Sequence, residues 1–177
     1  MALSQEKVHT IDDIYALPDG QRAELIDGEM YMLAPPSSRH QEILMNLSSS
    51  IHQYTKYGQG DCKVFPAPFA VFLNEDDRTY VEPDISVICD KSKLDDRGCN
   101  GAPDWVIEIV SPSSKRMDYL IKLLKYQKTG VKEYWVVDPE RKSVMVYDFA
   151  GGDADTYSFK DEIPVGIYDG DLKLKIE

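Results

Sequence analysis

Two apolar segments and the helical pattern between them decide the fold of this chain. Residues 105–110 read WVIEIV, and residues 133–137 read EYWVV. The first segment is an almost continuous apolar run, which is typical of a central strand that is buried on both faces. A helix is predicted between the two segments, from about Lys115 to Thr129, with Gly130 at its end. A strand, a helix and a second strand in this order indicate a crossover unit whose two strands run parallel in one sheet.

The sequence before this unit predicts a short helix, a hairpin and a long helix. Thr10 can cap the short helix, because two acidic residues follow it in the first turn. Two apolar runs, at 23–26 and 29–33, flank Asp27-Gly28, a dipeptide typical of tight hairpins. The long helix is expected from about residue 39 to residue 57, because its apolar side chains recur every three or four positions.

The rest of the chain predicts one surface loop and several strands. Pro66 and Pro68 fall inside the strand expected at residues 63–73 and indicate an edge strand or a bulge. Residues 90–103 are charged and contain glycines, which predicts the loop. The strands are expected at residues 63–73, 84–89 and 143–149 and, as short segments, within 156–177. This pattern indicates a mixed α/β fold with a largely antiparallel sheet, in a single domain that spans residues 1–177.

Composition and charge narrow the range of functions. The chain has 177 residues, of which 42% are hydrophobic and 29% charged, as in ordinary globular proteins rather than disordered ones. Its 20 Lys and Arg residues face 31 Asp and Glu residues, which gives a net charge of −11. This balance disfavours tight nucleic-acid binding by charge alone, although a local basic cleft or a metal-assisted phosphate site stays open. No apolar run approaches the roughly 20 residues of a membrane helix, so no membrane association is expected.

The cysteines and the start of the chain point to a reducing compartment. Cys62, Cys89 and Cys99 are odd in number and widely spaced, which disfavours a disulfide framework and a cysteine zinc site. We expect all three thiols to have packing roles. Residues 1–10 lack the hydrophobic core of a secretion signal. These features together predict a cytoplasmic protein.

Acidic residues in two predicted strands are the strongest chemical signal in the sequence. Glu108 interrupts the apolar run at 105–110, where an ionised carboxylate is costly unless it is paired or bound to a metal. Asp84 follows Pro83 and opens the strand expected at residues 84–89, although a plain turn aspartate is common at such a place. Carboxylates at the ends of neighbouring strands can converge on one Mg²⁺, and the backbone carbonyl of Ile109 could supply another oxygen. A structural ion pair of Glu108 is the alternative.

Three further residues could complete such a site. Glu24, in the first hairpin strand, is either an exposed acid or part of the site. Lys122 could reach a phosphate from its helix, or it could lie on a solvated flank and pair with Asp118. His40 lies on the apolar side of its helix, which predicts either a core histidine or a functional one.

Helical periodicity sets the expected direction of Lys122. The apolar stripe that should face the core consists of Met117, Leu120, Ile121 and Leu124. At about 100° per residue, Asp118, Lys122 and Lys125 then fall together on one flank, just off the buried face.

Several of these segments, in this order, resemble the Uma2 family of restriction-endonuclease-like proteins, which belongs to the PD-(D/E)xK nuclease superfamily. The resemblance runs from about Ile11 to the C-terminus. The segments that carry it are ELIDGE at 24–29, Pro83-Asp84, VIEIVSPS at 106–113, Asp118 to Lys122, Tyr126, and GVKEYWVVDP at 130–139.

The resemblance implies a restriction-endonuclease-like core, in which helices flank a mixed β-sheet that has additional antiparallel strands. It also implies an endonuclease that hydrolyses phosphodiester bonds of DNA with Mg²⁺, or with Mn²⁺. Asp84 and Glu108 match the two acids of the superfamily motif, and Glu24 matches an acid from the N-terminal segment. The motif lysine is expected at position 110, where this chain has Val110, and Lys122 is the residue that fits instead.

A homodimer is expected as well, because duplex cleavage acts on two antiparallel strands and a twofold pair of subunits matches that symmetry. Two other functions stay open. A nuclease fold that has lost catalysis could serve as a binding or assembly module, which Val110 and the acidic charge favour. A glycosidase could use two carboxylates, but its cleft should be lined with aromatic residues, and Trp105 and Trp135 lie in predicted core strands.

Overall fold

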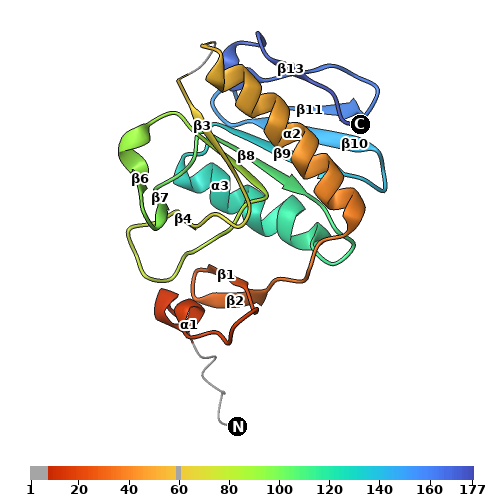
Figure 1. The fold of residues 1–177 in the computed structure, drawn as a ribbon. Coiled ribbons are helices and arrows are strands. Elements are labelled where there is room, and N and C mark those ends of the chain that lie inside the picture. The colour runs from red at the N-terminus through yellow and green to blue at the C-terminus, as the bar shows by residue number, and fades with distance from the viewer. Residues whose placement is uncertain (1–7, 59–60) are drawn as a thin grey trace.

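The computed structural model describes residues 8–58 and 61–177, and a six-stranded sheet lies at its centre (Figure 1). In spatial order the strands are β11 (Asp153–Ser158), β10 (Ser143–Asp148), β9 (Glu133–Asp138), β8 (Trp105–Ile109), β5 (Ile85–Ile88) and β3 (Lys63–Pro66). The β8 and β9 strands run parallel, and the other neighbours run antiparallel. This arrangement confirms the predicted crossover and the mixed α/β fold.

Helical segments cover both faces of the sheet (Figure 1). Helix α2 (Ser38–Lys56) begins after Ser37, whose hydroxyl accepts a hydrogen bond from the backbone N–H of His40 at 3.2 Å. It packs on the face that carries Trp105 and Ile107 of β8. The other face is covered by a π-helix, η2 (Met117–Lys122), which continues directly into α3 (Leu123–Thr129). Within the described parts of the chain, no helix is both long and apolar enough to span a membrane.

The N-terminal elements agree with the sequence patterns. Helix α1 (Ile11–Tyr15) is followed by the hairpin of β1 (Ala23–Ile26) and β2 (Glu29–Met32). Asp27 and Gly28 at its turn both have positive φ angles, of 53° and 87°, as a tight hairpin requires. The expectation about a secretion signal rests mostly on residues 1–7, which lie outside the described residues.

The segment at 90–103 is not the simple surface loop that its charge predicts. It contains η1 (Lys91–Lys93), β6 (Leu94–Asp95) and β7 (Gly98–Asn100). The β7 strand pairs with β4 (Val71–Phe72), so the strand predicted at 63–73 divides between two sheets. Such short strands carry no periodicity of their own, because pairing with other segments creates them.

The C-terminal strands begin earlier than predicted. Strand β11 starts at Asp153 rather than near residue 156, because its polar, exposed residues pair with β10 at the edge of the sheet. Three short elements follow: β12 (Ile163–Pro164), η3 (Gly166–Tyr168) and β13 (Lys173–Leu174). Asp169 and Gly170 form a turn after η3, and both residues have positive φ angles.

The prediction of three unpaired thiols is wrong for two of them. Cys62 and Cys89 form a disulfide, and their Cα atoms are 3.9 Å apart. Lys63 and Ile88 are register partners of β3 and β5, which places the two cysteines opposite each other across the strands. This register could not be read from thiols separated by 27 residues. Cys99 is free and buried, as expected. The expectation of a reducing cytoplasm therefore loses part of its support.

Gly98 is a position at which any side chain should be costly. Its φ angle is 149°, and a Cβ atom there would lie 2.1 Å from the backbone oxygen of Ala70. We expect Gly98→Ala to lower the free energy of unfolding by about 2–3 kcal/mol in denaturant titrations. Gly20→Ala is the matched control, because its φ angle is 82° but nothing lies within 4 Å, and it should cost about 1 kcal/mol. Equal losses in the two variants would contradict the role assigned to the Ala70 oxygen.

Candidate active site

Glu108 of β8 is the centre of a buried cluster of charged side chains. Its side chain is 5% exposed. Its Oε1 atom accepts hydrogen bonds from Lys122 Nζ and from the Tyr126 hydroxyl, both at 2.8 Å, and its Oε2 atom lies 3.4 Å from the backbone N of Asp84. Burial raises the pKa of Glu108 well above its usual value, and the ammonium of Lys122 only partly opposes that effect.

Lys122 links two carboxylates from distant parts of the chain. Besides Glu108, its Nζ atom contacts Glu24 Oε2 of β1 at 2.9 Å and approaches Asp118 Oδ1 to 3.9 Å. Burial alone would lower the pKa of Lys122, but the surrounding carboxylates outweigh it and hold this pKa well above its usual value. The other oxygen of Glu24 accepts a hydrogen bond from the backbone N–H of Glu82 at 2.9 Å. Lys122 is therefore a fixed, charged ammonium.

Asp84 and His40 lie on the more open side of this cluster, with side chains that are 18% and 12% exposed. The Oδ2 atom of Asp84 accepts a hydrogen bond from the backbone N–H of Ile109 at 2.7 Å, and it lies 3.1 Å from Nε2 of His40. Burial acts to lower the pKa of His40, but its hydrogen bond to Asp84 and the charge of that carboxylate outweigh burial and raise it. Ile109 contacts Asp84 through its N–H, and its backbone also bonds His40, which helps to raise the pKa of His40.

The cluster carries more negative than positive charge. Glu24, Glu108 and Asp118 are all buried, and the single ammonium of Lys122 faces them. Burial raises the pKa of Asp118 to about 6, against the influence of Lys122. If all three acids were ionised, two negative charges would stay uncompensated. Protonation or a bound cation must offset them, because buried unpaired charge is costly.

The predicted face of this helical segment is wrong for two of its four apolar residues, and the π-helix explains the difference. Met117 and Ile121 pack against the core as expected. Leu120 and Leu124, expected in the core, are 48% and 57% exposed, whereas Asp118 and Lys122 are buried. The prediction assumed α-helical winding of about 3.6 residues per turn. A π-helix is closed by hydrogen bonds between residues five apart, so it has more residues per turn and turns its side chains to other directions. Lys125 is buried too, and it bonds Asp27 of the hairpin rather than the cluster.

The structure thus brings Glu24, Glu108 and Lys122 into direct contact, with Asp84 beside Glu108. The sequence left the role of His40 open, and it indicated Asp118 as a partner of Lys122 and as part of the family resemblance. Tyr126 entered only through the family resemblance. Its position four residues after Lys122 was a usable signal, because residues four apart on a helix lie on the same side.

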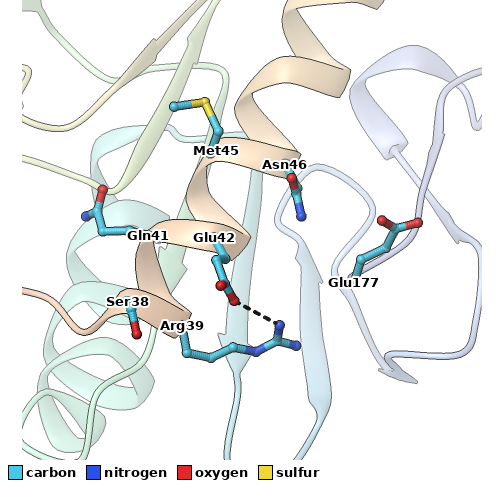
Figure 2. Close-up of a pocket in the computed structure, with 7 residues that line it drawn as sticks. All are labelled: Ser38, Arg39, Gln41, Glu42, Met45, Asn46 and Glu177. Atoms are coloured by element: carbon cyan, nitrogen blue, oxygen red, sulfur yellow. Dashed lines mark ion pairs between the residues drawn. The ribbon is translucent and has the colours of Figure 1, made fainter.

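A surface hollow lies away from this cluster. A shallow cavity of about 460 Å³ follows the outer side of the first turns of α2, where Arg39 and Glu42 form an ion pair at 3.5 Å (Figure 2). None of the clustered acids lines it. Trp105 and Trp135 are fully buried against each other, with ring centres 5.0 Å apart, so neither of them lines a sugar-binding cleft.

Comparisons with known proteins agree with this architecture. A solved structure described as a "putative nuclease" of DUF820, from Anabaena variabilis, aligns with a TM-score of 0.75 at 24% identity and covers 94% of both chains. At that identity the likeness shows the fold. No curated protein matches the sequence. Residues 11–165 match the model of the Uma2 family, described as "putative restriction endonuclease". Because the match covers most of the chain, this protein belongs to the Uma2 family.

Proposed function

We propose that this protein is a metal-dependent endonuclease that hydrolyses phosphodiester bonds of DNA. The observation that carries the proposal is the contact of Glu24 and Glu108 with Lys122 in one buried cluster, beside the partly exposed Asp84. Two acids from adjacent strands, a third from the hairpin and a fixed ammonium form the set of groups that metal-assisted phosphate chemistry uses. Membership of a family of restriction-endonuclease-like proteins supports the same reaction class.

The donor set fits a hard cation such as Mg²⁺ or Mn²⁺. Asp84 and Glu108 would hold the ion through carboxylate oxygens, with the carbonyl of Ile109 as a further oxygen donor. The excess of acidic over basic side chains in the cluster favours such binding. No three His, Cys, Asp or Glu side chains stand ready to hold a metal within residues 8–58 and 61–177, so side chains would have to turn on binding. A bound Mg²⁺ would lower the pKa of a water ligand and offset charge on the phosphate.

The chain's own residues then have separable tasks. The ammonium of Lys122 can orient the attacking water and offset the charge that develops on the phosphate oxygens. Glu24 holds Lys122 through a second ion pair, beside the one with Glu108. The hydrogen bond of His40 orients the carboxylate of Asp84, and the Tyr126 hydroxyl fixes Glu108. Lys122 would then supply the lysine that the superfamily motif has at position 110, where this chain has Val110.

DNA cleavage tests the proposal directly. We expect the full chain to cut DNA with Mg²⁺ or Mn²⁺ but not with chelator, and Asp84→Asn to lose cleavage at least about a hundredfold. Glu140→Gln is a matched control, because Glu140 is an exposed acid that pairs with Lys115, and it should cut like the wild type. Binding of DNA without cleavage in either metal would indicate the inactive binding module instead. We also propose a twofold homodimer, which a monomeric mass at micromolar concentration would contradict.

A further inference from the structure

Tyr134 lies beneath the π-helix and joins it to the central sheet. Its side chain on β9 is fully buried, and its hydroxyl donates a hydrogen bond to the backbone carbonyl of Asp118 at 2.9 Å. In a regular α-helix each internal carbonyl accepts from the N–H four residues later. A side chain that inserts into this ladder is a known cause of local departure from α-helical geometry. The hydrogen bond of Tyr134 therefore reaches the π-helix, the segment that departs from α-helical geometry.

Two ways of winding this segment compete. With α-helical winding, the apolar stripe that includes Leu120 and Leu124 would face the core and Lys122 would lie on the flank. The observed winding exposes both leucines and buries Asp118 and Lys122. Exposing leucine and burying charge both cost free energy. Contacts from the sheet side must therefore hold the π-helix, and the hydrogen bond of Tyr134 is made to the helix backbone itself.

We propose that Tyr134 is a positioning residue: its hydrogen bond to the Asp118 carbonyl keeps the winding in which Lys122 reaches Glu108 and Glu24. The inference rests on the proposed function, because it concerns the same site. Tyr126 contacts both Tyr134 and the cluster. Its ring centre is 5.0 Å from that of Tyr134, and its hydroxyl donates a hydrogen bond to Glu108. Two neighbouring tyrosines, Tyr134 of β9 and Tyr126 of α3, thus bond the backbone of Asp118 and the carboxylate of Glu108.

The side-chain ammonium signal of Lys122 in nitrogen-15 NMR tests the proposal on the metal-free full chain. Lys122→Arg assigns the signal by its absence. In the wild type we expect slow proton exchange, because the ammonium is buried and bonded to two carboxylates. In Tyr134→Phe the exchange should be at least tenfold faster. Tyr147→Phe is the control: Tyr147 stacks on Tyr134, and its hydroxyl makes no hydrogen bond within the described residues. In Tyr147→Phe the proton exchange of the Lys122 ammonium should equal that of the wild type.

A rescue variant separates winding from general loosening. Leu120→Gln with Leu124→Gln penalises the α-helical alternative, in which both side chains would be buried, and barely changes the observed one, in which both are exposed. Added to Tyr134→Phe, this pair should restore slow exchange at Lys122. An unprotected Lys122 in the wild type, unchanged exchange in Tyr134→Phe, equal loss in Tyr147→Phe, or failure of the rescue would each overturn the proposal.

Cleavage kinetics give a second, independent result. Tyr134→Phe should lower kcat at least tenfold with KM unchanged, because the lysine moves while the acids and the surface stay in place. A change in KM alone would count against the positioning role. If the wild type cuts no DNA, the proposed function fails, and the NMR comparison still decides whether Tyr134 positions Lys122.

Discussion

Replacing Lys122 with methionine is expected to lower the free energy of unfolding by about 3–5 kcal/mol at neutral pH. Methionine retains much of the apolar stem but removes the ammonium that contacts Glu24 and Glu108, whose side chains are 2% and 5% exposed. Two carboxylates then share a buried site with no compensating charge. Denaturant unfolding measures the loss, and DNA cleavage should disappear in the same variant.

Lys125→Met is the matched control for this prediction. Lys125 lies on the same helical segment and is equally buried, but its partner Asp27 is 70% exposed, so the loss should stay below about 1 kcal/mol. Equal losses in the two variants would show that stem packing, and not the charge cluster, is responsible.

A pH series sharpens the prediction for Lys122→Met. Burial already raises the pKa of Glu108 in the wild type, and removal of Lys122 should raise it further. A carboxyl whose folded pKa lies above its unfolded value of about 4.3 binds protons more tightly in the folded state. The deficit of the variant should therefore shrink as the pH falls from neutral toward the unfolded value. A deficit that grows on acidification would contradict the explanation.

Local patterns were sufficient to predict the framework of the site. The apolar run at 105–110 has enough length and continuity to predict a central strand, and Asp27-Gly28 fixes the hairpin that carries Glu24. Glu108 was identifiable because a carboxylate inside such a run needs a partner, whatever the rest of the fold. These inferences depend on contacts that a residue makes with near neighbours or on burial alone.

Contacts between distant segments account for what the sequence did not predict. The direction of Lys122 depends on a π-helix, and the hydrogen bond of Tyr134 to Asp118 comes from a strand 16 residues later. The leucines of the predicted stripe suggested the opposite face, because hydrophobic periodicity assumes α-helical winding. The Cys62–Cys89 disulfide likewise follows from the register of β3 and β5, which neither segment specifies alone.

Replacing Glu108 with glutamine is expected to reduce DNA cleavage at least about a hundredfold while the metal-free protein stays within about 1 kcal/mol of the wild type. Glutamine has nearly the same shape, and its oxygen can accept the hydrogen bonds of Lys122 and Tyr126. Lys122 keeps its ion pair with Glu24. The substitution removes one charge from a cluster with too many negative ones, so it breaks the site without leaving a carboxylate unpaired.

Melting curves with Mg²⁺ and with chelator separate this prediction from a purely structural role of Glu108. A ligand that binds the folded state alone stabilises it by about 2.7 kcal/mol at a hundredfold excess over its dissociation constant. We expect Mg²⁺ to raise the melting temperature of the wild type but not of Glu108→Gln. Glu133→Gln is the control, because Glu133 is a buried acid bonded to Trp135 and Ile167, away from the cluster, and it should keep the Mg²⁺ effect. The contrary outcome is a wild type whose melting ignores Mg²⁺ and a Glu108→Gln variant that is strongly destabilised in chelator. That result would make Glu108 a structural residue, because loss of its charge would orphan Lys122 and cost stability whether or not metal is present.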